Sequence, residues 1–263
     1  MLASIFRYKL AIVFLVLLSS CSVKEDRRDC PCLLAMTFSR IPELDSRIRM
    51  NVSLTGNRTS CEEMIELGAR PDTMCFSVRR ELVSVSALLS EKEDYILDMI
   101  IPFGSEAFGL YAGRVDIPCY GETAEGKLFL DKQFTRINLT LMGDGEDLSA
   151  SRFAVRGNVC GWHISDWTPI DGNFYHCKQL DLRNAVSFTV PRQLDDSMML
   201  DLILSGSGGV SASLALGKEL SERGYDWTLS NLPDVSMVLQ YSTVSLTIVS
   251  CEWSEAIVME VDI

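Results

Sequence analysis

The first cysteine of the chain stands where a bacterial lipoprotein is acylated. Arg7 and Lys9 precede the apolar run of residues 10–18, and two serines separate this run from Cys21. A basic segment, an apolar segment and small residues in this order are typical of a secretory signal peptide. A membrane-spanning helix needs about 20 apolar residues, so this run is too short to span. The sequence therefore predicts a signal peptide over residues 1–20 and acylation, for example with palmitate, at Cys21.

Eight further cysteines could form disulfide bonds. They are Cys30, Cys32, Cys61, Cys75, Cys119, Cys160, Cys177 and Cys251. An even number of cysteines in an exported protein favours disulfides or buried structural thiols, although the sequence does not determine the pairing. One residue separates Cys30 from Cys32, whereas a zinc knuckle has two, and no second closely spaced pair completes four ligands. We therefore expect no metal and no cofactor.

The remaining reactive side chains do not indicate an enzyme. His163 lies three positions after Cys160, which would place the two side chains on opposite faces of a strand. The glycine-rich residues 205–209 lie between two predicted strands, so we interpret them as a hairpin loop rather than a phosphate-binding loop. The acids of residues 143–147 lack the twelve-residue loop of a calcium site. We expect no catalytic residues and no small-molecule substrate.

Aromatic side chains leave a second kind of function open. Trp162 and Trp167, followed by Phe174 and Tyr175, could form a flat surface for sugar rings. The alternative is that the tryptophans fill the cores of small domains. An exposed coplanar pair of tryptophans would support a cell-surface glycan-binding lipoprotein, and buried rings would not.

The charge of the chain argues against nucleic acid as a partner. The full chain has a net charge of −12 at neutral pH. Removal of Arg7 and Lys9 with the signal peptide leaves 22 basic residues against 36 acidic ones, a net charge of −14. Such a surface repels phosphate backbones.

Short strands separated by turn residues are expected along the mature chain. Apolar residues alternate with polar ones in residues 48–54 and 135–141, which is typical of strands with one buried face. Helices are expected only at residues 59–67, where a serine and a glutamate have the spacing of a capping box, and at residues 216–224. Residues 95–101 are expected to form a strand that ends at a proline.

The expected fold is all-β, with two Greek-key β-sandwich domains in tandem. Residues 143–147 contain two glycines and no apolar side chain, so they are the predicted linker. The N-terminal β-sandwich domain would then comprise residues 33–147 and the C-terminal one residues 148–263. Residues 21–32 would form a lipid-anchored linker.

Several short motifs occur in order along the mature chain. They are residues 26–33 behind the predicted acylation site, residues 190–197, 216–218, 224–227 and 231–235, and a final strand pair around Trp253. Their combination resembles the FimB-type family of fimbrial anchor lipoproteins from Bacteroides-like bacteria. The resemblance covers nearly the whole mature chain.

The resemblance implies a structural function in cell adhesion. Members of this family resemble two transthyretin-like sandwiches in tandem, tethered by lipid to the outer membrane at the base of a pilus. Their subunits join when one subunit donates a strand to a neighbour, so the implied partner is a fimbrial stalk subunit. Lys24, Glu25 and Asp26 resemble the signal that sends lipoproteins of these bacteria to the cell surface.

The C-terminal segment is the candidate donor strand. It comprises Ala256, Ile257, Val258, Met259, Glu260, Val261, Asp262 and Ile263. Ile257, Met259 and Val261 would share one apolar face, and an open sheet edge offers unpaired backbone groups to such a strand. The alternative, and the more frequent fate of such a strand, is that it completes the C-terminal domain.

Two kinds of modification are also implied by resemblance. Thr73, in a predicted loop, and Ser197, close to a predicted strand, lie in triplets that resemble the O-glycosylation acceptor of Bacteroides-type periplasms. Fimbrial stalk subunits look as if they lose their first strand to a trypsin-like protease, whereas an anchor should retain it. We therefore interpret Arg40, Arg47 and Arg49 as ordinary surface charges.

Overall fold

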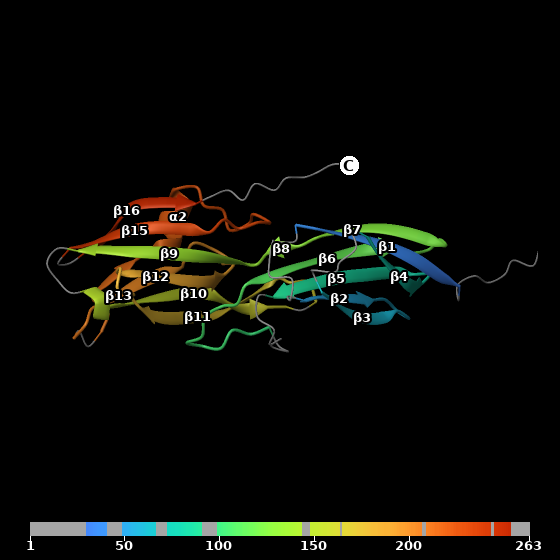
Figure 1. Ribbon diagram of the computed structural model, residues 1–263, viewed down its shortest axis with the longest axis horizontal. Helices are drawn as coiled ribbons and strands as arrows, with labels where there is room; N and C mark the ends of the chain where they lie inside the picture. The colour runs from blue at the N-terminus through green and yellow to red at the C-terminus, as the bar shows by residue number, and fades with distance from the viewer. Residues whose placement is uncertain are drawn as a thin grey trace, which may run out of the picture.

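The computed structural model describes residues 30–40, 49–66, 73–90, 99–143, 148–163, 165–206, 209–242 and 245–253. These residues are mostly in β-strands, with one short helix, α2 (Leu216–Glu222), and a 3-10 turn at Leu148–Ala150. The expected β-rich fold is confirmed. The strands form four sheets, which occupy the two ends of an elongated molecule (Figure 1).

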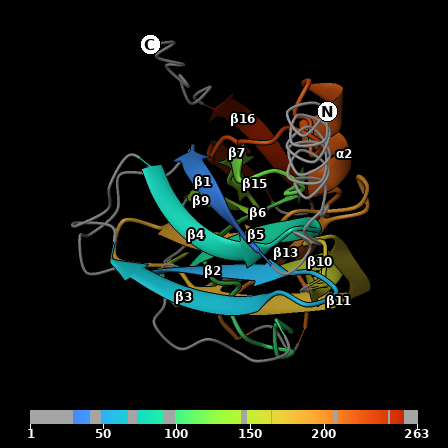
Figure 2. The same ribbon diagram turned by 90° about the vertical axis from the view of Figure 1, so that its right-hand side faces the viewer.

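Two sheets make up what we call the N-terminal half. One has the strand order β4 (Thr73–Arg79), β1 (Pro31–Ser39) and β7 (Thr123–Phe129). The other has the order β3 (Ser60–Glu66), β2 (Arg49–Thr55), β5 (Leu82–Ser90), β6 (Leu110–Pro118) and β8 (Asp131–Lys132). Seen along the long axis, β1 and β4 lie over β2 and β3 (Figure 2). Side chains from both sheets form one buried cluster, so the sheets face each other across a common core.

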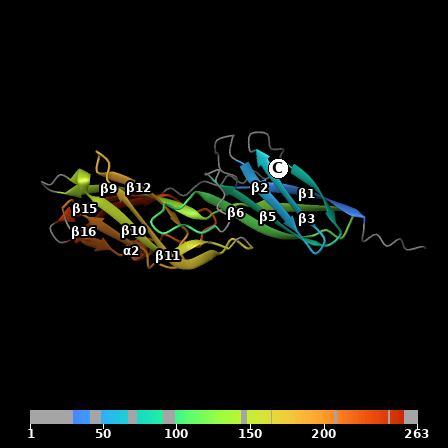
Figure 3. The same ribbon diagram turned by 90° about the horizontal axis from the view of Figure 1, so that it is seen from below.

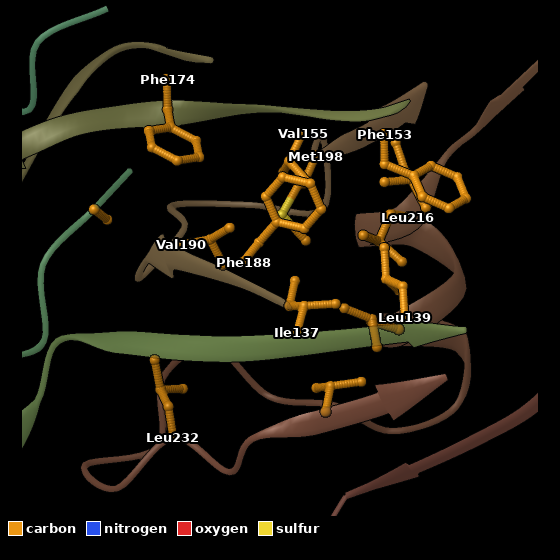
Figure 4. Close-up of a cluster of buried hydrophobic side chains, with 14 of the residues drawn as sticks. Ile137, Leu139, Phe153, Val155, Phe174, Phe188, Val190, Met198, Leu216 and Leu232 are labelled. Atoms are coloured by element: carbon orange, nitrogen blue, oxygen red, sulfur yellow. The ribbon is translucent and has the colours of Figure 1, made fainter. Parts of the chain in front are cut away.

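The other two sheets make up the C-terminal half. One has the order β11 (Pro169–Gln179), β10 (Arg152–Trp162), β13 (Met199–Ile203) and β14 (Ala212–Leu214). The other has the order β12 (Ala185–Pro191), β9 (Phe134–Gly143), β15 (Val235–Ser242) and β16 (Ser245–Trp253). The two halves follow one another along the long axis (Figure 3). Large side chains such as Phe153, Phe188 and Met198 fill the space between these sheets (Figure 4).

Strand β9 lies within residues 33–147, the predicted N-terminal domain, but pairs with strands of the C-terminal half. It pairs antiparallel with β12 and parallel with β15, so it belongs to the C-terminal half. Its first residue, Phe134, packs in the N-terminal core, whereas Ile137 and Leu139 pack in the C-terminal core. The strand therefore crosses from one core to the other before the predicted linker. Residues 144–147 of that linker lie outside the described residues.

The predicted helix at residues 59–67 is wrong, because this segment forms β3. Seven consecutive residues of β3 pair antiparallel with β2 in a hairpin. A capping box stabilises only the first turn of a helix, and a full ladder of cross-strand hydrogen bonds outweighs it. The helix expected at residues 216–224 is confirmed as α2, and Gly224 ends it with a φ of 91°.

Two other segments also differ from expectation. Residues 99–101 are not part of a strand but open a loop, in which Met99 has a φ of 47°. Strand β11 has no apolar alternation that would predict it from the sequence, and most of its residues are only partly buried. Local pattern carries little information where tertiary contacts decide the conformation.

Candidate functional site

Strand β1 is the centre of its sheet rather than an edge. It pairs antiparallel with β4 on one side and parallel with β7 on the other, so its backbone is satisfied on both sides. Cys32, Leu34 and Met36 alternate with more exposed residues and are completely buried in the N-terminal core. Removal of β1 would leave an open groove between β4 and β7 and expose these core contacts.

The end of β1 is held in place by Arg40. The Arg40 guanidinium forms an ion pair with Asp131, with an Nη1–Oδ1 distance of 2.9 Å, and lies 4.9 Å from the Phe129 ring centroid. The Leu130 amide donates a 3.0 Å hydrogen bond to the Ser39 carbonyl. Arg40 is therefore not the ordinary surface charge that the sequence suggested, because it fastens β1 to β7 and β8.

The other two arginines considered as protease sites differ from Arg40. Arg49 has a side chain that is 55% exposed and lies 3.8 Å from Glu66 across the β2–β3 pair. It fits the expected surface charge. Arg47 lies outside the described residues.

Strand β16 is an edge of the C-terminal half. It pairs with β15 on one side only, and Val249 at its middle is 57% exposed. The register pairs Trp253 with Val235, which is the first residue of β15. Since β15 runs parallel to β9, β16 ends on the side of the C-terminal half that faces the N-terminal half.

The last described residue is packed firmly. The Trp253 ring makes an edge contact with Tyr225, with centroids 5.7 Å apart. The Tyr225 hydroxyl donates a 2.9 Å hydrogen bond to the Pro233 carbonyl. The candidate donor residues 256–263 lie outside the described residues. The chain therefore enters that segment from a fixed point at the end of an edge strand.

A loop of the N-terminal half docks on the C-terminal half. This docking loop, residues 99–109, precedes β6 and buries Met99, Ile101 and Phe108 in the C-terminal core. The Ile101 amide donates a 2.7 Å hydrogen bond to Cys160, and the Trp162 amide donates one of 3.1 Å to Met99. The loop thus extends the sheet of β10 and fixes the two halves relative to each other.

Glu106 completes the docking contact. Its carboxylate accepts a 2.6 Å hydrogen bond from Lys178 and one of 2.9 Å from the Thr189 amide. Burial alone would raise the pKa of Glu106, but these two donors outweigh burial and the pKa is lowered. His176 also contacts the docking loop, because its Nδ1 atom lies 2.8 Å from the Gly104 carbonyl oxygen.

Charged side chains join the halves on the opposite side of the junction. Lys132, which is almost fully buried, lies 2.6 Å from an Asp234 carboxylate oxygen. The Arg192 guanidinium donates to the Lys132 carbonyl at 2.7 Å and to the Gln133 side chain at 3.1 Å. The Asp234 contact links β8 to the start of β15, and the Arg192 contacts link the residues at the end of β8 to the end of β12.

The eight described cysteines are all thiols, and they differ in burial. Cys30 and Cys75 are exposed, and Cys32 and Cys119 are fully buried in the N-terminal core. The remaining described cysteines are partly buried: Cys61, Cys160, Cys177 and Cys251. Cys21, the predicted acylation site, lies outside the described residues.

The tryptophans do not form an exposed platform. Trp162 is 0% exposed and Trp167 is 7% exposed. Both pack in the C-terminal core, as the alternative interpretation predicted. An aromatic pair in which one ring is exposed and the other partly buried lies elsewhere. Phe103 of the docking loop is 74% exposed and stacks on Tyr175, with centroids 5.1 Å apart and an interplanar angle of 13°.

The Phe103–Tyr175 pair lines an open hollow of about 390 Å³. Arg156, Asn158 and Asp171 add polar groups to it. Arg156 is positioned by a bidentate contact with Asp201, at 2.7 and 3.1 Å. Sequence reasoning included Tyr175 but missed Phe103, because residues 102–104 read only as the end of a strand.

The side chains considered for chemistry have structural contacts instead. Cys160 Sγ faces the Asp171 carbonyl at 3.9 Å, while His163 is exposed. The segment 205–209 joins the antiparallel strands β13 and β14, as the hairpin interpretation predicted. In the described ranges, His, Cys, Asp and Glu form no group of three or more that could hold a metal. No helix among the described residues is long and apolar enough to cross a membrane.

The two residues considered as O-glycosylation sites differ in where they lie relative to the strands. Thr73 is the first residue of β4 and pairs with Thr37, rather than lying in a loop. Ser197 is exposed and lies before β13, with its amide bonded to Asp195 at 2.8 Å. Both residues are exposed, but only Ser197 lies outside a strand.

The fold is similar to those of several solved structures. A candidate polysaccharide-binding protein from Bacteroides thetaiotaomicron aligns with a TM-score of 0.61 at 11% identity, over 85% of this chain and 98% of that one. A candidate adhesin from Bacteroides ovatus aligns with a TM-score of 0.60 at 14% identity, over 90% and 98%. The fimbrial anchor protein Mfa2 from Porphyromonas gingivalis aligns with a TM-score of 0.56 at 11% identity, over 87% and 99%. No protein-family model and no curated protein matches the chain.

Proposed function

We propose that this protein is a fimbrial anchor or assembly subunit that joins a neighbouring fimbrial subunit by strand addition. Its fold, shared with a fimbrial anchor protein and with candidate adhesins over most of each chain, supports this function. The single observation that carries it is the central position of β1, which begins ten residues after the predicted acylation site Cys21.

A subunit that accepted a strand in place of β1 would lose its membrane attachment. Cleavage after β1 would separate both cores from Cys21, and the groove between β4 and β7 would open. Here β1 fills that groove, and Arg40 holds the end of the strand. The N-terminal half is therefore complete without a partner, so the role left for this chain is that of the donor.

The C-terminal segment is the donor in this proposal. Residues 254–263 follow Trp253, whose ring is fixed on Tyr225, and ten extended residues reach about 33 Å. That length is enough to add a strand to a sheet of a neighbouring subunit. The apolar face of Ile257, Met259 and Val261 would fill the groove of that sheet, while backbone hydrogen bonds provide the pairing.

The two halves fit two tandem transthyretin-like sandwiches, each with two facing sheets and its own core. We place the boundary where β8 is followed by β9, since β9 belongs to the C-terminal sheets. Acylation at Cys21 would hold the N-terminal half at the outer membrane, exposed at the cell surface. Replacement of Cys21 by Ala should release the protein from the membrane fraction and abolish incorporation of a labelled fatty acid.

Deletion of residues 256–263 in the native host tests the donor role. The truncated protein should remain at the cell surface, because the described cores are intact, and fimbriae should be shed into the medium. Retention of fimbriae on cells at the wild-type level would show that this segment is not the donor. Antibody labelling of intact cells gives the surface level that makes the two strains comparable.

A second candidate function is glycan binding at the Phe103–Tyr175 pair. The exposed face of Phe103 can stack on a sugar ring, and Arg156, Asn158 and Asp171 offer hydrogen bonds beside it. One protein of similar fold is described as a candidate polysaccharide-binding protein, which also favours this function. Phe103→Ala should lower affinity for a bound polysaccharide at least tenfold, whereas Tyr120→Ala, an exposed aromatic of the N-terminal half, should not. If the two variants bound the polysaccharide with equal affinity, the hollow would not be the binding site.

A further inference from the structure

Two cysteines of the N-terminal half are brought together by backbone pairing. Cys32 lies near the start of β1, and Cys119 directly follows β6. The Cys119 amide donates a 2.9 Å hydrogen bond to Glu81, which fixes the end of β6. The Leu33 amide donates one of 2.9 Å to Glu122, which fixes the start of β1 beside the connection from β6 to β7.

The two side chains meet inside the core. Both cysteines are 0% exposed and belong to the same buried cluster. The Cys32 thiol also lies close enough to Cys119 to contribute to the raised pKa of the Cys119 thiol. Cys32 comes from the three-stranded sheet, whereas Cys119 comes from the end of the facing five-stranded sheet. A covalent bond between them would therefore join the two sheets across the core.

We propose that Cys32 and Cys119 form an intramolecular disulfide bond after export of the chain. Oxidation removes two protons and two electrons from the thiols. A disulfide of a thiol oxidoreductase or of a small-molecule thiol accepts the electrons and becomes two thiols. One cysteine first forms a mixed disulfide with this oxidant, and the other then displaces it, so that the Sγ–Sγ bond forms.

The order of events follows from burial. Burial, together with a smaller contribution from the neighbouring Cys32 thiol, raises the pKa of Cys119 to about 11. The thiolate is the attacking species in disulfide exchange, so the folded core suppresses the reaction. The bond is therefore made during folding, before β1 closes over Cys119, and an external thiol does not reach it afterwards.

The bond has a mechanical consequence that rests on the proposed anchor function. A fimbria under tension pulls on its anchor, and the load enters the N-terminal half through the residues between Cys21 and β1. Hydrogen bonds to β4 and β7 resist that load, and so do the buried side chains of β1. A bond from Cys32 to Cys119 transfers the load to the second sheet by a covalent path, so β1 is not extracted.

Peptide mapping of the mature protein, purified from the envelope of the native host, tests the bond. The protein is unfolded in iodoacetamide without reductant and digested with trypsin. The expected product links residues 29–40 to residues 115–127, with no alkylation at Cys119. Because Cys30 shares the first peptide, the Cys30→Ser variant should give the same linked product. Complete alkylation of both Cys32 and Cys119, or linkage of either to another cysteine, would overturn the proposal.

Stability provides a second readout that does not depend on peptide mapping. A disulfide closing a loop of about 90 residues raises the ratio of folded to unfolded protein on the order of 10³-fold. Reductant in the unfolding titration should lower this ratio accordingly in the wild type and in the control variant Cys160→Ser. It should have no effect in Cys32→Ser or Cys119→Ser. A wild type that is insensitive to reductant would contradict the bond while leaving the anchor function to be judged by fimbrial retention.

Discussion

The two halves of the molecule differ in how the first and the last described strands, β1 and β16, are paired. In the N-terminal half, the first described strand, β1, lies at the centre of a sheet and is paired on both sides. In the C-terminal half, the last described strand, β16, is an edge with one open side. Under the function we propose, the paired N-terminal strand belongs to the attached end of the chain and the open edge to the end that assembles with a neighbour.

The exposed edge of the N-terminal half supports this contrast. Strand β3 presents the acidic side chains of Glu62, Glu63 and Glu66 around an exposed Met64. Charged side chains on an edge strand oppose pairing with other chains. The described part of β16 carries one acid, Glu252, and an exposed Val249. The open edge thus lies where the candidate donor segment begins.

The largest expected effect comes from breaking the core of the C-terminal half. Trp162 is fully buried and makes an edge contact with Phe108 of the docking loop, with centroids 5.3 Å apart. Trp162→Ala should lower the free energy of unfolding by about 3–5 kcal/mol and release the loop. Leu182→Ala, at a side chain 97% exposed, should change it by less than about 0.5 kcal/mol. Urea unfolding measures both, and similar values for the two variants would contradict the packing.

The next effect tests the central position of β1. Leu34 and Leu33 are neighbours in sequence, but Leu34 is buried in the N-terminal core and Leu33 is exposed. Leu34→Ala should lower the free energy of unfolding by about 2–4 kcal/mol, and Leu33→Ala by less than about 1 kcal/mol. The same titrations give this comparison. A larger effect at Leu33 would mean that β1 presents its other face to the core.

A smaller effect is expected where the halves meet. A Cβ atom added to Gly161 would lie 2.4 Å from the Met99 carbonyl oxygen, so the docking loop has to move. Gly161→Ala should cost about 1–3 kcal/mol and speed hydrogen exchange at the Ile101 amide. Gly209→Ala is the control, because its added Cβ meets nothing within 4 Å. Unchanged exchange in Gly161→Ala would show that the contact at Gly161 does not hold the loop.

The smallest expected effect is on the pH dependence of the free energy of unfolding. The folded-state pKa of Glu106 is lowered, so the ionised carboxylate stabilises the docked loop at pH values above its ordinary pKa, and this stability is lost as the pH falls through the lowered value. Glu106→Gln should therefore flatten the decline in stability between neutral and acidic pH. Chemical unfolding at a series of pH values measures this slope. An unchanged slope in the variant would assign the acid sensitivity to other carboxylates.

The sequence predicted where strands lie better than it predicted which strands pair with each other. The alternation of β2 and β9 predicted two strands with one buried face, and Gly224 correctly marked the end of the helix. The partner of β9 could not be predicted, because alternation fixes the buried face of a strand and not its neighbours. Strand β9 pairs in parallel with β15, about 100 residues later in the chain.

Errors arose where distant contacts override local preference. Residues 60–66 have the start signal of a helix, yet pairing with β2 makes them a strand. Met99 and Ile101 are apolar and were predicted to lie in a strand, but they form a loop that the other half buries. Burial of Trp162 matched the more frequent of two interpretations. The exposed Phe103 was missed because its stacking partner, Tyr175, lies more than 70 residues away.

Substitutions at alternate positions of the C-terminal segment test whether it donates a strand to a fimbrial subunit, as we propose. One variant replaces Ile257, Met259 and Val261 by Ser, and its matched control replaces Val258, Glu260 and Asp262 by Ser. Fimbrial protein in the culture medium is compared with that on the cells of each strain, at equal surface levels of the anchor. If the apolar face of this segment fills the groove of a neighbouring subunit, fimbriae are shed in the first strain and retained at the wild-type level in the second. Equal retention in both strains would contradict the donor role.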